Sequence, residues 1–412
     1  MSNSPFHTVT IAGATGNVGY AIAEAFLNDG SYNVKILRRK LDENEKAKSL
    51  NSKGAEIVYA DHSQKDDLVK ALKGTDVFVS AVFESSNNTS LYDIQVSFLL
   101  AAKEASVKRF IPSEFSNGYK TTGHVFNDEK FRFREELEKS GLEYTYIHTG
   151  LFQEFFGWFG YDVKNKKAKF YGDGNTKIPS TSLSDIGKYT VETLKIPEAR
   201  NAHIRVIGAY LTLNEYLQKF EEATGSKWEV IEDRDVRYRF KNKIDPIPSM
   251  SDDFIAFVTE NSNFPEYDND KFSFTPQPVT KVIETLVSQA INDNVLSGLT
   301  EICKSIKELE LFINVHNNNY GIVKLIESQK NLFDIRFITY SQNMDGTFCN
   351  ILENSLNKHS NTIQYFKMTT PPTTNILSSL INLKELELNV EGIVKKYNND
   401  WYGRTYKDFE WF

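Results

Sequence analysis

A short apolar run, three closely spaced glycines and a helical pattern follow one another in the stretch TVTIAGATGNVGYAIAEAFLNDG, residues 8–30. Gly13, Gly16 and Gly19 stand where a strand meets a helix that starts near Val18. There the first glycine allows a tight turn, the second lets backbone N–H groups approach a pyrophosphate, and the third lets the helix pack on the sheet. The stretch therefore predicts a dinucleotide-binding turn, with a turn that holds no ligand as the alternative.

The first half of the chain repeats this order of strand and helix. The predicted strands are Thr8–Ala12, Asn33–Leu37, Glu56–Tyr59, Val77–Ala81, Arg109–Pro112 and Tyr144–Thr149. The predicted helices are Val18–Asn28, Glu43–Ser52, Lys65–Leu72, Leu91–Ala105 and Asn127–Lys139. Apolar strands separated by helices of this length predict an α/β fold, a Rossmann doubly wound parallel sheet that binds ligands at the carboxyl ends of its strands.

The domain organisation follows from changes in this rhythm. We predict an NADP-binding domain over 1–290, with a Rossmann core over about 6–150 and a substrate lobe over about 151–288. Within the lobe, AKFYGDGNTKIPST predicts a β-hairpin, because its glycines supply positive φ. A separate C-terminal segment is expected over 295–412.

That C-terminal segment carries an L-x-x-L-x-L pattern four times, starting at Ile306, Leu332, Ile363 and Leu383. The distances between the starts bracket the length of a leucine-rich repeat, in which each repeat is a strand followed by a helix or an irregular return. The spacing is uneven, so an ordinary αβ segment is the alternative.

Composition narrows the class of protein. The chain has 48 Lys and Arg against 55 Asp and Glu, a net charge of −7, which argues against a nucleic-acid-binding surface. No apolar run is long enough for a membrane span, and the N-terminus does not read as a signal peptide. Cys303 and Cys349 fit no metal spacing, so we expect reduced thiols, no metal site, and a cytoplasmic protein, with a nuclear location left open.

The end of the second predicted strand selects the nucleotide. Arg38 and Arg39 stand where an NAD-selective fold places an acidic residue. Arginine binds a 2′-phosphate through charge-assisted hydrogen bonds, so NADP (NADPH) is the expected cofactor. A solvated basic turn is the alternative.

Other cofactor contacts follow from the same architecture. Asp61 and His62 follow the third strand, where the adenine should lie, and residues 81–83 end the fourth strand, near the ribose of the nicotinamide. For Ala81, Val82 and Phe83 the alternative is that they only pack at the end of the strand. The full set expected to bind the cofactor is Gly13, Thr15, Gly16, Asn17, Val18, Gly19, Arg38, Arg39, Asp61, His62, Ala81, Val82, Phe83, Lys130, Gly150 and Phe152.

The tyrosine and lysine pair of common short-chain dehydrogenases, Y-x-x-x-K, has only two matches, Tyr267/Lys271 and Tyr320/Lys324. The first lies in a loop rich in Asp and Asn, and the second in the repeat segment. Neither is placed to meet a nicotinamide, so proton transfer by a tyrosine is not expected.

Several motifs carry a family resemblance: GATGNVG, the arginine after the second strand, VKRFIPSEF, K-x-x-x-R-x-x-L-E, GLEYTYI and YGDGNTKIPSTSLSDIGKY. Over about residues 6–288 the sequence resembles the NmrA-like and isoflavone-reductase-like family of atypical short-chain dehydrogenases. The resemblance implies that Lys130 lies by the nicotinamide and acts as the acid–base group, since a partly desolvated ammonium gives up its proton more readily.

The resemblance also suggests where a substrate would bind. Ser113 and Glu114 either contact substrate or cofactor or cap the turn after the strand. The run from Gly150 to Phe156 resembles the family segment that closes over the nicotinamide, with aromatic residues of the core as the alternative. The expected substrate contacts are Ser113, Glu114, Phe115 and Gln153. His124 and His148 are expected to be structural.

Two functions of different classes remain open. One is an NADPH-dependent reductase of a small carbonyl-bearing, enone or aromatic molecule. The other, also found in the family, is a protein that binds NADP without turnover and acts as a redox sensor or transcriptional co-regulator. The C-terminal repeats resemble fungal leucine-rich, F-box-type proteins, in LIESQKNLFDIRF and LNKHSNTIQYFKM, which implies a surface for a protein partner.

Overall fold

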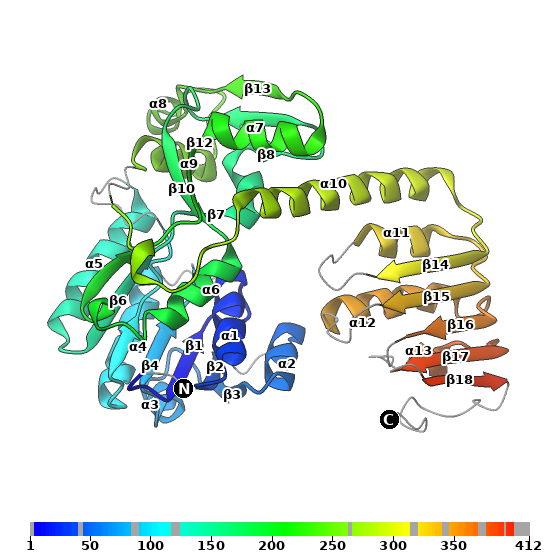
Figure 1. Ribbon diagram of the computed structural model, residues 1–412, viewed down its shortest axis with the longest axis horizontal. Helices are drawn as coiled ribbons and strands as arrows, with labels where there is room; N and C mark the ends of the chain where they lie inside the picture. The colour runs from blue at the N-terminus through cyan, green and yellow to red at the C-terminus, as the bar shows by residue number, and fades with distance from the viewer. Residues whose placement is uncertain are drawn as a thin grey trace. The chain divides into compact units, whose positions relative to one another are not determined.

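The computed structural model describes residues 4–39, 44–83, 90–116, 124–262, 266–313, 320–339, 346–369, 376–390 and 393–398. Figure 1 shows the order of the helices and strands along the chain. The chain divides into two units, residues 1–287 and 288–412, which are described separately below.

Among the described residues of the first unit, parallel strands form one sheet of order β11-β6-β5-β4-β1-β2-β3. Its strands are β1 (Thr8–Ala12), β2 (Asn33–Arg38), β3 (Glu56–Tyr59), β4 (Val77–Ser80), β5 (Arg109–Ile111), β6 (Glu143–His148) and β11 (Ala202–Arg205). This arrangement confirms the predicted doubly wound sheet. All these strands end at the same edge of the sheet, because they are parallel.

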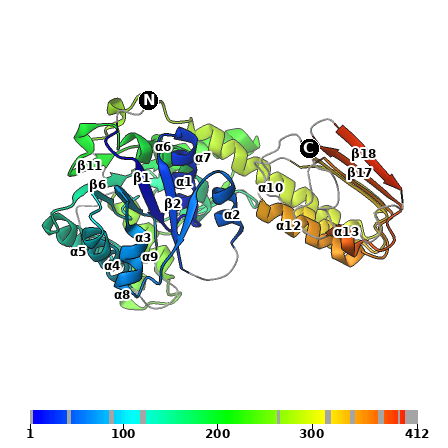
Figure 2. The ribbon, with the colours of Figure 1, turned by 90° about the horizontal axis from the view of Figure 1, so that it is seen from below.

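Helices cover both faces of this sheet (Figure 2). One face packs against α1 (Asn17–Asp29), α2 (Glu45–Ser52) and α6 (Leu183–Glu192), and the other against α3 (Lys65–Leu72), α4 (Leu91–Glu104) and α5 (Val125–Lys139). Successive strand residues point to opposite faces. Ile11 therefore joins the α1 and α6 side, whereas its neighbour Ala12 joins the core that contains Phe78 and Phe110. Both faces are buried, which explains the continuous apolar strands.

Two small sheets make up the substrate lobe. One has the order β12 (Ala209–Thr212), β10 (Lys177–Thr181), β7 (Leu151–Phe152), and the other β13 (Glu229–Glu232), β9 (Lys167–Phe170), β8 (Tyr161–Asp162). The rest of the lobe is η1 (Gln153–Phe159), α7 (Leu213–Thr224), α8 (Val236–Asn242), α9 (Met250–Glu260) and the start of α10 (Val279–Ile302). η2 (Pro197–Ala199) and η3 (Asn269–Lys271) pack with the parallel sheet and α6 instead. With β11 and α6, they show that the Rossmann core takes in part of the predicted lobe over 151–288.

The predicted hairpin over AKFYGDGNTKIPST is wrong. β9 pairs with β8 and β13, while β10 pairs with β7 and β12, so the two strands belong to different sheets. Gly172 (φ +134°) and Gly174 (φ +74°) do take positive φ. They direct the chain from one small sheet to the other instead of folding it back on itself.

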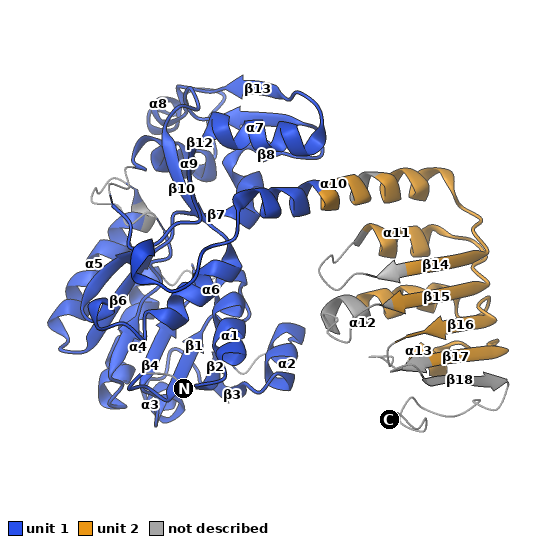
Figure 3. Cartoon of the chain, in the orientation of Figure 1, with its two compact units in different colours: residues 1–287 blue, residues 288–412 orange. Residues whose placement is uncertain are grey.

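The second unit contains a further sheet, of order β14-β15-β16-β17-β18 among its described residues (Figure 3). Its elements are β14 (Glu308–Ile313), α11 (Tyr320–Ser328), β15 (Asp334–Thr339), α12 (Gly346–Ser355), η4 (Leu356–His359), β16 (Tyr365–Met368), α13 (Ile376–Ser379), β17 (Glu385–Val390) and β18 (Ile393–Asn398). The first four strands are parallel and β18 is antiparallel.

The L-x-x-L-x-L positions coincide with the core of this second unit. In the motif that starts at Leu332, for example, Ile335 and Phe337 lie on β15 and are buried with Leu332. The corresponding residues of the other three motifs belong to the same apolar cluster. Each repeat thus supplies one strand, and successive strands share one core.

No helix in the described part of the chain is both long and apolar enough to cross a membrane.

The contact between α1 and α6 yields a prediction about stability. A Cβ on Gly187 would lie 2.4 Å from the carbonyl oxygen of Ala21 and 2.9 Å from the Cβ of Ala25. We expect Gly187→Ala to force the two helices apart and to cost about 1–3 kcal/mol of unfolding free energy, measured by denaturant titration. The control is Gly157→Ala, because a Cβ there meets nothing within 4 Å. Equal stability of the two variants would contradict the prediction.

Candidate functional site

The glycine-rich loop is shaped by two close approaches of the backbone. Gly13 has φ +80°, and a Cβ on it would lie 2.5 Å from the carbonyl oxygen of Ala81. A Cβ on Gly19 would lie 2.2 Å from the carbonyl oxygen of Gly13. Gly16 is less constrained, since its Cβ would meet only that same oxygen, at 3.2 Å. The first and third glycines therefore allow the loop to lie against β4 and α1 to lie against the loop.

This loop stands at the point where the order of the strands reverses. From β1 the sheet continues through β2 and β3 on one side and through β4 and β5 on the other. Crevices at such points, outside the carboxyl ends of the strands, are where doubly wound sheets bind ligands. α1 begins here with Gly16 as its N-cap, and no side chain makes a cap hydrogen bond among the described residues. Its first N–H groups and its dipole suit an anion.

Cations lie at the end of β2. Arg38 is the last residue of the strand and is half-buried, and Arg39 beside it is exposed. Lys46, in the first turn of α2, was not predicted; its Nζ donates to Asn17 Oδ1 at 3.2 Å and lies 5.8 Å from the centre of the Tyr20 ring. The fold brings this lysine to the first residue of α1. Its only local signal is a basic residue early in a helix.

Asp61 and His62 follow β3. The Asp61 carboxylate accepts hydrogen bonds from the Ser63 N–H and hydroxyl, at 2.9 and 2.8 Å, and these bonds lower the pKa of Asp61. Desolvation, with Arg39 nearby, lowers the pKa of His62 to about 4. The buried Nε2 of His62 has no hydrogen-bond partner among the described residues. A neutral imidazole with an open acceptor or donor therefore stands near the expected adenine position.

The end of β4 is tied to its neighbours through the backbone. The Ala81 N–H donates to the Ala12 carbonyl at 2.9 Å, and the Val82 carbonyl accepts from the Ser113 hydroxyl at 2.5 Å. Phe83 is 59% exposed although it is a large apolar side chain. The backbone of this segment lines the crevice, whereas the side chain of Phe83 is presented to solvent.

The four residues expected to contact substrate make contacts within the protein. Ser113 bridges to β4 as described, and Phe115 is buried. The Glu114 carboxylate is buried and binds the guanidinium of Arg134, with Nε–Oε1 at 2.9 Å and Nη2–Oε2 at 2.6 Å. Gln153 is also buried, and its Nε2 donates to the Ser180 hydroxyl at 3.1 Å. Direct contacts of these side chains with a substrate stay a prediction.

Lys130 projects from α5 toward the end of β5. Its Nζ donates to the Glu114 carbonyl at 3.0 Å and to the Ser116 hydroxyl at 3.3 Å. Desolvation of the ammonium lowers the pKa of Lys130, Arg134 lowers it further, and Glu114 opposes the change. With two of its three N–H groups held by the protein, the amine is fixed in place, and its pKa is shifted in the direction that acid–base chemistry needs.

The connection from β6 to β7 lies beside this lysine. The Ser116 carbonyl accepts from the backbone N–H of Thr149 at 3.0 Å, which links the Lys130 site to the end of β6. Gly150 has φ +67°, and a Cβ on it would lie 2.2 Å from the Pro179 carbonyl oxygen. Phe152 follows, with its ring 6.0 Å from that of Phe155. Phe152 also packs against the core on the α1 side of the sheet, so the tight turn at Gly150 is followed by a partly buried aromatic side chain.

The two Y-x-x-x-K matches lie elsewhere, as expected. Tyr267 is 51% exposed, and Lys271 pairs with Asp268 at 2.7 Å beside η3. Tyr320 begins α11 in the second unit.

Two histidines contact each other at the C-terminal end of β6. His148 is fully buried, and its Nε2 lies 2.9 Å from Nδ1 of the exposed His203 on β11. Desolvation, followed by the charges of Arg134 and Arg205 among others, lowers the pKa of His148 well below its ordinary value. His148 is therefore neutral in the folded protein, in agreement with its expected structural role rather than a role as an acid.

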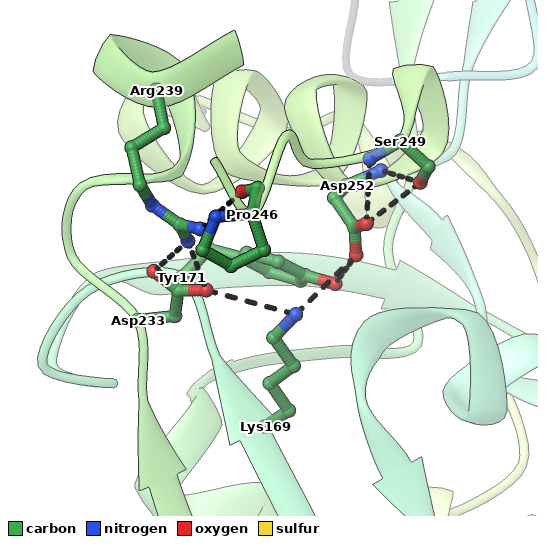
Figure 4. Close-up of polar contacts among 7 residues, drawn as sticks. All are labelled: Lys169, Tyr171, Asp233, Arg239, Pro246, Ser249 and Asp252. Carbon is green, nitrogen blue, oxygen red and sulfur yellow. Dashed lines mark hydrogen bonds and ion pairs between the residues drawn. The ribbon is translucent and has the colours of Figure 1, made fainter. Parts of the chain in front are cut away.

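The outer part of the lobe is held by a polar network (Figure 4). The Arg239 guanidinium binds both carboxylate oxygens of Asp233 at 2.7 Å and donates to the Pro246 carbonyl at 2.7 Å. Lys169 Nζ lies between Asp233 and Asp252, at 3.7 and 3.6 Å. The Tyr171 hydroxyl donates to Asp252, whose pKa is lowered to about 2 by this hydrogen bond and by those from Ser249, against the effect of desolvation. These contacts fix α8 and α9 on β9.

The fold and the site together define a dinucleotide-binding protein of the doubly wound α/β class, with a lysine beside the crevice. Comparison with known proteins identifies the family: the sequence model of the NmrA-like family matches residues 5–249, and the chain belongs to this family.

Its relatives include named reductases. Pinoresinol reductase 1 of Arabidopsis thaliana is 34% identical over 239 residues, which covers 54% of this chain and 75% of the relative. An isoflavone reductase homolog of Lupinus albus is 31% identical over 243 residues, covering 54% and 77%. Among solved structures, the complex of leucoanthocyanidin reductase from Vitis vinifera with NADPH superposes with a TM-score of 0.58 at 26% identity, over 68% of this chain and 99% of that one.

These relatives are plant proteins, so they do not support the expected fungal affinity. The family model ends before the second unit. The relatives therefore do not test the resemblance of that unit to leucine-rich, F-box-type proteins, which stays a prediction.

The state of His148 yields a prediction about pH. The folded protein holds His148 neutral, whereas the unfolded chain protonates it below a pH of about 6.5. Stability is therefore unaffected above that pH and falls as the pH drops below it, by about 1.4 kcal/mol per pH unit for this group. Urea unfolding at about pH 7 and about pH 5.5 should show a smaller loss for His148→Gln than for the native chain. The exposed His7→Gln is the control; an unchanged loss in His148→Gln would refute the prediction.

Proposed function

We propose that this protein is an NADPH-dependent reductase of a small carbonyl-bearing, enone or aromatic molecule. The observation that carries the proposal is the position of Lys130: a held amine with a lowered pKa, hydrogen-bonded to the segment after β5. The reductases among the relatives, including those named for pinoresinol, support the same class of reaction.

The residues present fit NADP(H). The loop at Gly13 and the turn at Gly150 are places where a Cβ would collide with backbone, so both are shaped for close approach of the chain. The N-terminus of α1 suits the pyrophosphate, and Arg38, Arg39 and Lys46 would hold the 2′-phosphate. The Nε2 of His62, which has no hydrogen-bond partner in the part of the chain that the structure describes, would meet the adenine end. The leucoanthocyanidin reductase that shares this fold was solved with NADPH.

Bound NADPH supplies a hydride to the substrate. Lys130 holds a proton on Nζ and delivers it to the oxygen or carbon on which negative charge develops. The Glu114 carbonyl and the Ser116 hydroxyl take two N–H groups of the ammonium and leave the third for the substrate.

A redox sensor is the second candidate. The same hydrogen bonds that hold Lys130 would suit a lysine that only binds the ribose of the nicotinamide. In that case cofactor binding, rather than turnover, would be the function.

We infer further that the second unit is a leucine-rich-repeat-like surface for a protein partner. Its parallel strands recur with the L-x-x-L-x-L pattern, as they do in solenoid repeats. The face of the sheet opposite the shared core carries charged residues in cross-strand register, among them Glu310, Arg336 and Lys367. A charged, regular sheet face of this kind suits protein recognition.

The cofactor assignment predicts a preference for NADPH over NADH. Arg38→Ala removes a charge-assisted contact worth about 1.5–3 kcal/mol, so NADPH should bind roughly 10- to 100-fold more weakly while NADH binding hardly changes. Fluorescence titration of both nucleotides measures this. Lys35→Ala, on the same strand but near its other end, is the control. Equal affinity of the native chain for the two nucleotides would exclude the phosphate site.

The role of Lys130 predicts a loss confined to turnover. With a panel of aromatic carbonyls, enones and pinoresinol, the native chain should consume NADPH, followed at its nicotinamide absorbance. Lys130→Met should lower kcat at least about 100-fold, because the proton donor is gone. NADPH affinity should stay within a few-fold, and Lys139→Met, exposed on the same helix, should behave as native. A native chain that binds NADPH but oxidises it with no substrate would favour the sensor.

A further inference from the structure

One helical turn beyond Lys130, α5 carries a second cation that is fully used by the protein. Arg134 is 8% exposed and Glu114 is 1% exposed, and they form the two-pronged ion pair described above. Arg134 also lies over the rings of Phe131 and Tyr146, at 4.7 and 5.6 Å from their centres. The guanidinium therefore has a single, well-defined position.

Glu114 contacts α5 through both its backbone carbonyl and its side chain. Its backbone carbonyl accepts from Lys130, and its carboxylate binds Arg134. Lys130 and Arg134 are four residues apart, so they are neighbours on one side of the helix, with Cβ atoms about 5–6 Å apart. The segment after β5 is thus clamped to α5 at two successive turns, and Lys130 cannot move without the segment that carries Glu114.

The charged groups that face Lys130 come from its own helix and from the segment after β5. Arg134 faces it from its own helix, and Glu114 faces it from the segment after β5. His148, on β6, lies close enough to interact electrostatically with both Lys130 and Arg134, and it is neutral in the folded protein. The Lys130 amine therefore experiences one fixed positive and one fixed negative charge, with opposite effects on its proton.

We propose that Arg134 and Glu114 are positioning residues for Lys130, which fix the place of its amine and set the balance between its charged and neutral forms. The consequence for catalysis rests on the proposed function, whereas the arrangement itself does not. Arg134 favours the neutral amine and Glu114 favours the ammonium. Because the two charges act in opposite directions, removal of one or of the other should move the protonation of Lys130 in opposite directions.

The test measures the amine directly in the resting full-length chain. The rate of acetylation of Lys130 by acetic anhydride, followed by peptide mass spectrometry across pH, reports the fraction of neutral amine. Arg134→Gln should move the midpoint of this profile up by about one pH unit, and Glu114→Gln should move it down by a similar amount. The double variant should return it close to the native value. Glu135→Gln, in the exposed pair with Lys139 on the same helix, should leave it unchanged.

The proposal can still be tested if the single variants fail to fold. Each single variant leaves a buried charge without its partner, at a cost of about 3–5 kcal/mol, whereas the double variant leaves none. Arg134→Lys keeps the cation and should retain the native labelling profile even if it loses the two-pronged contact. If the single variants unfold, Arg134→Met/Glu114→Gln carries the test: loss of the clamp should raise the plateau rate of acetylation at high pH, where the amine is neutral in every variant, whereas Arg134→Lys should keep the native plateau. An unchanged plateau rate in the double variant would overturn the proposal.

Shifts in the same direction for Arg134→Gln and Glu114→Gln, or no shift in either folded variant, would overturn the proposal and leave the pair with a role in stability alone. A failure of the proposed function would give a different combination of results. A protein that consumes no NADPH but shows the opposed labelling shifts would keep the positioning role and lose the reductase.

Discussion

The close approach of the glycine-rich loop to the end of β4 is the constraint on which the site depends. A side chain at Gly13 would collide with the Ala81 carbonyl, and one at Gly19 would collide with the loop itself. Because neither glycine has a side chain, α1 starts directly at the reversal of strand order, and no side chain among the described residues caps its first N–H groups. All the other contributions to the site, from the ends of β2 to β6, reach the same crevice because the strands are parallel and end at one edge.

The fold of the first unit was largely predictable because its signals are local. Most strands carry a short β-branched or apolar run and the helices between them have an apolar face, so their alternation can be predicted without knowledge of distant contacts. β11, with the sequence AHIR, lacks such a run and was not predicted. The hairpin prediction failed for the opposite reason. Positive φ at Gly172 and Gly174 was correctly expected, but a turn does not determine which strands pair on either side of it. That choice depends on β7 and β13, which are distant in sequence.

The site was predictable at positions whose role is set by the backbone and less so at side chains that find their partners in space. Gly13 and Gly150 lie in turns with positive φ, and Gly19 lies in α1 where a Cβ would collide with the loop. Lys46 was missed because only the packing of α2 brings it to Asn17. Glu114 was expected to contact substrate or cofactor or to cap the turn, and its pairing with Arg134, on which the carboxylate is buried, was not predicted. A carboxylate after a strand and an arginine twenty residues later give no local sign that they meet.

The buried pair of Glu114 and Arg134 is hard to explain by stability alone. Taking two charges out of water costs several kcal/mol each, and replacement of such pairs by apolar residues is often neutral or stabilising. An apolar pair would pack α5 against the segment after β5 equally well. It would leave the Lys130 amine in the same apolar surroundings with no charge on either side, so its protonation would depend on desolvation alone. The ion pair adds two opposed charges at fixed positions. It also holds the Glu114 carbonyl that accepts from Lys130. The protonation of the Lys130 amine therefore depends on two charges whose positions are fixed by the fold.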